Sequence, residues 1–248
     1  MPDNVKYRIL CTRPLTDSLI AAAGDNGIAI DVLDFIQIKP LVNKDLLGME
    51  NMIKVFNNPA TPLVFTSAHA VKTFADHYQY QGGRHYPLPN PVCCIDGNTK
   101  KTIQQLLPGN PILAEASYGK DLATAIIQLG HVSEVIFFCG NQRRDDLPEG
   151  LRKAGITVHE FVIYENMPTP AVIADDYDGI LFFSPSAVKS FFSVNSLPSK
   201  TVCFAIGTTT TSILEDYTDN KIIMSPLTGE ESMVQTAIFY FNNINCYE

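Results

Sequence analysis

The residues best suited to chemistry in this 248-residue chain lie in six short loops rich in Ser, Thr, Asn and Gly. Each loop follows an apolar run and precedes an amphipathic one, so it joins an expected strand to an expected helix. Residues of these types cap helices and leave backbone N–H groups free to meet an anion. Helix capping alone explains any single loop equally well, but six of them favour a polar ligand. The loops are 66–69, 96–99, 139–144, 184–187, 207–211 and 225–229.

Two further features could contribute positive charge or a proton donor. Arg143 and Arg144 follow a Gly-Asn turn at the end of an expected strand, where an anion contact and simple solvation are equally good interpretations. Tyr164 ends another apolar run, and its aligned position in an internal repeat is Ile36, so the repeat itself requires no hydroxyl there. The structural alternative is a tyrosine packed in a strand with its hydroxyl at the surface.

Other catalytic arrangements find no support in the sequence. No GxGxxG, GxxxxGK[ST] or GxSxG motif follows an expected strand, which argues against a nucleotide cofactor and an α/β-hydrolase elbow. The five histidines are scattered, and the six cysteines form no CxxC pair and have no histidine at metal-ligand spacing. We therefore expect neither a metal nor a cofactor.

The elements that position these residues belong to a packed, acidic protein. Hydrophobic residues make up 46% of the chain and charged residues 18%, unlike the composition of a disordered chain. The formal net charge of -8 argues against a broad nucleic-acid-binding surface. No apolar run is long enough to span a membrane, and residues 1–13 do not resemble a secretion signal. We expect a cytoplasmic globular protein without a membrane partner.

Apolar, strand-like runs alternate with helical patterns along the whole chain, which predicts an α/β protein with doubly wound parallel sheets. The order of these runs repeats. LVFTSAHAVKTF (63–74) aligns without gaps with ILFFSPSAVKSF (180–191), and 92–103 aligns with 202–213. Two further segments match, 111–122 with 222–233 and 154–164 with 26–36. Four such matches in register indicate that the chain arose by duplication, with the order 1-2-3-4-1′-2′-3′-4′.

Several motifs, in this order, resemble the uroporphyrinogen-III synthase family. The run CGNQRRDDLP (139–148) is followed by LRKAGITV (151–158) and VIYE (162–165). Four shorter motifs are similar to the same family: CTRP at 11–14, FTSxxAV at 65–71, SPSAV at 184–188 and AIGTTT at 205–210. Each motif is weak alone, but their order and spacing are specific, and together they cover nearly the whole chain.

The resemblance implies two flavodoxin-like domains joined by a two-stranded connector. The first strand-helix-strand unit then belongs with the C-terminal units, so domain 1 comprises 1–36 and 171–248, and the inserted domain 2 comprises 43–162. The connector is expected at 37–42 and 163–170, where proline occurs and helical periodicity is lost. Nothing in the sequence demands a partner chain, so a monomer is expected.

The resemblance also implies a cyclising lyase that converts the linear tetrapyrrole hydroxymethylbilane to uroporphyrinogen III. Water is lost and ring D is inverted through a spiro intermediate, which requires positioning and a proton donor more than a strong nucleophile. Tyr164 matches the family's active-site tyrosine, and its phenol is expected to assist departure of the hydroxyl. The substrate contacts implied by matching motifs are Thr66, Ser67, Gly140, Asn141, Ser184, Ser186, Thr209 and Thr210. We expect Arg13 and Arg143 to add positive charge for the substrate carboxylates, while the role of His69 stays open.

Two other function classes remain as alternatives at this point. One is a cytosolic two-lobed protein that binds a small anion, which absence of turnover would distinguish. The other is a nucleotide-sugar transferase, although 248 residues is short for that class and no dominant Gly-rich diphosphate loop occurs.

Overall fold

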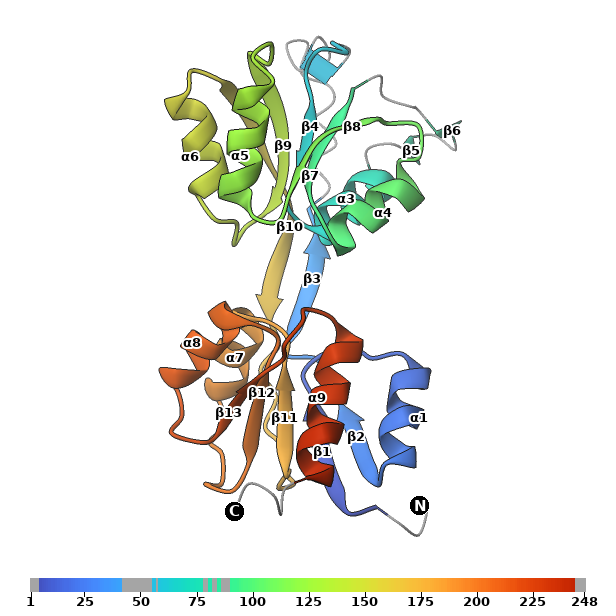
Figure 1. The fold of residues 1–248 in the computed structure, drawn as a ribbon, viewed down its shortest axis with the longest axis vertical. Coiled ribbons are helices and arrows are strands. Elements are labelled where there is room, and N and C mark those ends of the chain that lie inside the picture. Colours follow the sequence, from blue (N-terminus) through green and yellow to red (C-terminus); the bar gives the residue numbers. More distant parts are fainter. Residues whose placement is uncertain are drawn as a thin grey trace. The chain divides into compact units, whose positions relative to one another are not determined.

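The computed structural model describes residues 5–41, 55–56, 58–77, 80–81, 84–85 and 90–243. The chain forms two compact units (Figure 1), unit 1 from Met1–Gln37 and Met167–Glu248 and unit 2 from Ile38–Asn166. It passes between them within two strands that are neighbours in one sheet, β3 (Ile36–Pro40) and β10 (Thr157–Pro168). The connector expected at 37–42 and 163–170 overlaps both strands, and residues 42–54 of the predicted division lie outside the described residues.

Unit 1 is built on a five-stranded parallel sheet with the order β13-β12-β11-β1-β2. Its strands are β1 (Tyr7–Cys11), β2 (Ile28–Val32), β11 (Gly179–Phe182), β12 (Val202–Ala205) and β13 (Ile222–Met224). Its helices in the described residues are α1 (Asp17–Asp25), α7 (Pro185–Phe192), α8 (Thr208–Glu215) and α9 (Glu230–Asn242). Ile9 and Cys11 pack with α1 and α9, whereas Leu10 packs with α7 and α8, so the helix pairs cover opposite faces (Figure 1).

Unit 2 contains a sheet with the order β3-β10-β9-β4-β7-β8. Its remaining strands are β4 (Leu63–Phe65), β7 (Val92–Ile95), β8 (Ile112–Ala116) and β9 (Glu134–Gly140), and β5 (Tyr80–Gln81) and β6 (Arg84–His85) form a separate short pair. Its helices in the described residues are α3 (Ala68–His77), α4 (Asn98–Leu106), α5 (Gly119–Gln128) and α6 (Asp146–Lys153). Phe138 packs in a core with α3 and α4, and its neighbour Phe137 packs in the opposite core with α5 and α6.

The two sheets share one spatial order but are entered by the chain at different points. In unit 1 the strands, numbered along the chain, have the spatial order 2-1-3-4-5, which is the flavodoxin-like arrangement. In unit 2 the same five positions are occupied by β10-β9-β4-β7-β8, so among these five strands the chain starts at the third position, β4, and finishes at the first, β10. Strands at the same position of the two sheets, such as β4 and β11 or β7 and β12, lie in the segments that align in the sequence. The predicted fold class, two flavodoxin-like α/β domains, is confirmed.

Both sheets contain the fully buried strands that continuous apolar runs predict. Every residue of β11 and β12 in unit 1 and of β4 in unit 2 is buried, because helices cover both faces of these strands. The five described cysteines, at 11, 93, 94, 139 and 203, are buried and unpaired, and Cys246 lies outside the described residues. In the part of the chain that the structure describes, no helix is long and apolar enough to cross a membrane.

Candidate active site

The position of Tyr164 depends on an irregularity in β10. Val162 and Tyr164 pair with the consecutive β9 residues Cys139 and Gly140, so Ile163 is an extra residue in β10. Such a bulge interrupts the alternation of a strand, and both Ile163 and Tyr164 therefore belong to the core that α3 and α4 cover. A regular strand would direct one of these two side chains to the opposite face of the sheet.

The Tyr164 hydroxyl lies at the carboxyl edge of the unit 2 sheet, where β4 ends. It donates a hydrogen bond to Ser67 Oγ at 3.0 Å, and the backbone N–H of His69 donates to the same oxygen at 3.1 Å. The ring centroids of Tyr164 and His69 are 5.9 Å apart. Burial raises the pKa of the Tyr164 phenol, and the hydrogen bond to Ser67 only partly opposes this. The phenol is therefore protonated at neutral pH and available as a donor.

Gly140 provides the space that the Tyr164 ring occupies. A Cβ atom at position 140 would lie 2.4 Å from Cζ, 2.6 Å from Cε2 and 2.8 Å from the hydroxyl oxygen of Tyr164. Ordinary contacts between carbon atoms are about 3.5–4.0 Å, so no side chain fits at position 140 while the ring stays where it is. The close approach of ring and backbone thus accounts for glycine at this position.

Asn141 binds β10 at two points around Glu165. Its backbone N–H donates to the carbonyl oxygen of Tyr164 at 3.1 Å, and its side-chain Oδ1 accepts from the N–H of Asn166 at 2.9 Å. These two bonds hold the strand segment that carries Tyr164 just beyond the bulge. Thr66, the remaining predicted contact in this cluster, directly follows β4 and is half-buried.

Arg143 lies near this cluster in sequence, but two carboxylates already engage its guanidinium. Nε donates to Glu160 Oε1 at 2.6 Å, and Nη1 forms an ion pair with Asp145. Arg152 binds the other oxygen of Glu160 at 3.2 Å. The hydrogen bonds to Glu160 and then to Asp145 raise the pKa of Arg143, so the guanidinium stays protonated, and the two carboxylates balance its charge. Sequence reasoning did not detect this arrangement, because Glu160 lies on a neighbouring strand.

The predicted cation of unit 1, Arg13, lies just beyond the carboxyl end of β1. Its Nη2 forms a 2.9 Å ion pair with Glu230 Oε1 at the start of α9, and the guanidinium lies 5.3 Å from the centroid of the Phe183 ring. The Arg13 side chain is 48% exposed, so the ion pair leaves it accessible to solvent and to a ligand. Burial raises the pKa of the Asp34 carboxyl, and the charge of Arg13 opposes that shift.

The four predicted hydroxyl residues of unit 1 differ in their accessibility. Ser184 caps α7, because its Oγ accepts from the N–H of Ala187 at 3.1 Å, and it lies 3.2 Å from Ser186 Oγ. Thr209 is exposed in the first turn of α8. Thr210 is only 2% exposed, so its hydroxyl does not face solvent. The structure thus gathers these residues at one edge of the sheet, but it buries Thr210.

Two features of the cluster were missed in the sequence, namely the bulge at Ile163 and the packing of Tyr164 against Gly140. The repeat contained a signal for the second. In an ungapped alignment of 11–36 with 139–164, Thr12 and Ile36 occupy the positions of Gly140 and Tyr164, so both residues of the contact differ between the two segments.

Comparison with known proteins decides the family. The family model described as uroporphyrinogen-III synthase HemD matches residues 17–235. The chain belongs to the uroporphyrinogen-III synthase family. The solved structure of the uroporphyrinogen-III synthetase from Helicobacter pylori matches with a TM-score of 0.68 at 15% identity, over 94% of this chain and 99% of that one.

A second uroporphyrinogen-III synthase structure, a mutant from Thermus thermophilus, matches with a TM-score of 0.60 at 11% identity, over 98% of this chain and 100% of that one. At such identities these two likenesses show the fold alone. None of the curated proteins matches the chain at a significant level.

Membership of the uroporphyrinogen-III synthase family defines the reaction. The chain is a cyclising lyase of porphyrin biosynthesis that acts on a tetrapyrrole, closing hydroxymethylbilane to uroporphyrinogen III with loss of water. This function is favoured over the small-anion-binding protein and the nucleotide-sugar transferase that the sequence left as alternatives.

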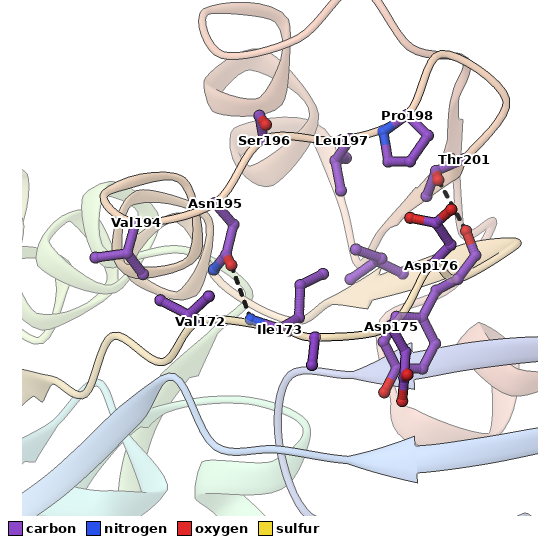
Figure 2. A pocket seen from close by; sticks show the side chains of 13 residues that line it. Val172, Ile173, Asp175, Asp176, Val194, Asn195, Ser196, Leu197, Pro198 and Thr201 are labelled. Atoms are coloured by element: carbon purple, nitrogen blue, oxygen red, sulfur yellow. Dashed lines mark hydrogen bonds between the residues drawn. The ribbon is translucent and has the colours of Figure 1, made fainter.

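Unit 1 contains a cavity of about 230 Å³ (Figure 2), and none of the predicted contacts lines it. Its walls come from segments 172–177 and 194–201, which precede β11 and β12, and from Ile180 of β11, whereas the predicted contacts follow the carboxyl ends of the strands. Asp175 and Asp176 contribute carboxylates to it, and Asp175 pairs with Arg8 at 2.9 Å. Acidic walls do not suit the polycarboxylate substrate of a uroporphyrinogen-III synthase, so we do not assign substrate to this cavity.

Proposed function

We propose that Tyr164 is the proton donor in the cyclisation, acting on the terminal hydroxyl group of hydroxymethylbilane. The observation that carries this proposal is the buried, protonated phenol at the carboxyl edge of the sheet, hydrogen-bonded to Ser67 Oγ at 3.0 Å. Ligands of open α/β sheets bind at this edge. Of the predicted site residues in the described part of unit 2, Tyr164 is the one that is buried and has a side-chain proton to donate.

The step balances with Tyr164 as the only acid. The C–O bond of the hydroxymethyl group breaks, its electron pair leaves with the oxygen, and the phenol proton completes a water molecule. The pyrrole nitrogen supports the cation that remains, and this cation attacks the substituted carbon of ring D to give the spiro intermediate. The older bond from that carbon to its bridging carbon then breaks, and the bridging carbon recloses on the free ring carbon of ring D. The phenolate accepts the proton that this carbon loses when the ring becomes aromatic again. The raised pKa makes free phenolate costly, so proton transfer accompanies bond cleavage, and the developing cation and phenolate stabilise each other.

Ser67 supports both protonation states of Tyr164. It accepts from the phenol, while the His69 N–H occupies another position on the same oxygen. The Ser67 hydroxyl proton stays free to rotate, so it can donate to the phenolate once the phenol proton has left. Gly140 and Asn141 contribute by holding the Tyr164 ring and its strand segment in place.

The other predicted residues are proposed to bind the carboxylate arms of the substrate. Those with accessible groups at the strand ends are Thr66, Ser67, Arg13, Ser184, Ser186 and Thr209. Thr210 could contribute only after the first turn of α8 had moved, because its hydroxyl is buried. Arg143 would need to exchange Asp145 or Glu160 for a substrate carboxylate.

We further propose that the chain acts as a monomer in the cytoplasm. The five buried, unpaired cysteines support a reducing compartment, and each unit closes its own cores around its own sheet. Size-exclusion chromatography with light scattering tests the oligomeric state, and a stable dimer at micromolar concentration would refute the monomer.

The proposed function is tested by isomer analysis. Freshly generated hydroxymethylbilane is supplied, the products are oxidised, and the porphyrin isomers are separated. The wild-type protein is expected to give isomer III in excess over the enzyme-free control, and Tyr164→Phe to lower kcat by about 10²–10⁴-fold. Tyr217→Phe, at an exposed position on unit 1, is the matched control with unchanged kcat. Isomer I alone from folded protein would refute the function, and full kcat in Tyr164→Phe would remove Tyr164 from the mechanism.

A further inference from the structure

Among the described residues, each unit has one large apolar side chain at the edge where its ligand is expected that is more than two-thirds exposed. Tyr118 is 69% exposed between β8 and α5, and Leu227 is 70% exposed between β13 and α9. The two loops occupy the same place in the two units, after the edge strand and before a helix that begins at or just after a glycine. Single exposed apolar residues are common, but their occurrence in equivalent loops of both units calls for an explanation.

Local structure does not explain the aromatic ring of Tyr118. Tyr118 is the N-cap of α5, with φ -132° and ψ 156°, and its side chain makes no capping hydrogen bond. Ser, Thr, Asp and Asn are the residues that stabilise this position. Among the described residues the Tyr118 ring has no hydrogen bond, ion pair or ring contact, so packing does not account for it either. Residues that contradict local preferences without a structural gain often serve function.

The Tyr118 loop adjoins the segment that holds Tyr164. A Cβ atom at Gly119 would lie 3.5 Å from Leu147 Cβ, in the first turn of α6. That turn directly follows the loop after Gly140, which contacts Tyr164. Tyr118 is therefore part of the same edge of unit 2 as the proposed acid.

The Leu227 loop is held with its leucine directed to solvent. Ser225 Oγ donates to the carbonyl oxygen of Leu227 at 2.7 Å and lies 2.8 Å from Ser232 Oγ. The loop leads into Glu230, which forms the ion pair with Arg13. Leu227 therefore lies on unit 1 three residues before Glu230, the ion-pair partner of Arg13, and Arg13 is expected to bind substrate.

We propose that Tyr118 and Leu227 each contact a pyrrole ring of the bound tetrapyrrole, an inference that rests on the proposed function. Pyrrole rings are flat and apolar, and their carboxylate arms need different partners, the hydroxyl and N–H groups of the neighbouring loops. Tyr118 stacks on one ring, and Leu227 covers another by van der Waals contact. Holding rings in this way restricts the conformations of a flexible linear substrate before it closes.

The test compares Tyr118→Ser and Leu227→Ser with two controls. Phe239→Ser removes a side chain that is 61% exposed near the C-terminal end of α9, and Val172→Ser removes one that is 76% exposed in the wall of the unit 1 cavity. Both positions lie away from the ligand edge. KM for hydroxymethylbilane is expected to rise about 3- to 10-fold in each of the first two variants, with unchanged melting temperature. Tyr118→Phe keeps the ring and is expected to keep the wild-type KM.

The outcomes separate the inference from the function on which it rests. If the wild-type protein makes isomer III and Tyr118→Ser and Leu227→Ser keep its KM, the inference is wrong and the function stands. An equal rise of KM in Phe239→Ser and Val172→Ser also overturns the inference, since the effect would then be general to exposed apolar residues. Isomer I alone from the wild-type protein refutes the function itself.

Discussion

The contact between Gly140 and the Tyr164 ring makes Gly140→Ala the sharpest perturbation of the site. The added Cβ would lie 2.4 Å from Cζ, so restoring an ordinary contact requires the ring or the backbone to move by about 1 Å. Gly140 does not have a positive φ, so alanine brings no backbone strain of its own and the effect is steric.

Two magnitudes follow from this overlap. Overpacking of a buried position costs about 1–3 kcal/mol of the free energy of unfolding. A displacement of about 1 Å in a catalytic group lowers kcat by roughly 10²-fold, because the donor no longer meets the leaving oxygen. We therefore expect Gly140→Ala to lose both stability and turnover, with a larger share of isomer I in the product.

Urea unfolding and the isomer assay measure these two effects. Gly109→Ala is the matched control, because nothing lies within 4 Å of the Cβ that it adds and its φ is not positive. In a Tyr164→Ala background the ring is absent, so Gly140→Ala should no longer lower the free energy of unfolding. The same loss of stability with and without the ring, or wild-type kcat in Gly140→Ala, would refute the reasoning.

Two further predictions concern Asn141 and Glu134. Asn141→Asp keeps the acceptor for the Asn166 N–H and should retain near wild-type kcat. Asn141→Leu removes this acceptor and should lower kcat at unchanged KM. A large rise of KM in Asn141→Asp would instead indicate that Asn141 contacts the substrate carboxylates. Glu134 accepts from His159 Nε2 and Thr61 Oγ1, each at 2.9 Å, and the bond to His159 is the main reason that its pKa is lowered. A carboxyl group whose pKa is lowered by folding stabilises the folded protein at pH values above its ordinary pKa. This stability is lost as the pH falls through the pKa that the group has in the folded protein. Glu134→Gln should therefore lose about 1 kcal/mol at pH 7 by urea unfolding. Its difference from the wild type should shrink as the pH falls below the ordinary carboxyl pKa, and a loss that does not change with pH would exclude ionisation as the cause.

The sequence alone was sufficient for the fold class, and it singled out Tyr164 as a candidate. Strands buried on both faces are continuously apolar, and a duplication keeps its register along the chain, so both can be recognised without coordinates. The family motifs are likewise contiguous, and the tyrosine stood out because the repeat has Ile36 in its place. The sequence also indicated which strand ends would carry polar loops, since these follow directly from the alternation of strands and helices.

The environment of Tyr164 was decided only by tertiary structure. The bulge at Ile163 depends on how β10 pairs with β9, and the ion pairing of Arg143 depends on Glu160, which is 17 positions away in the chain. The burial of Thr210 depends on the packing of α8 against its sheet. Local patterns specify strands, helices and caps, because those interactions join residues near in sequence, whereas access, charge and orientation at a site arise from contacts between distant segments.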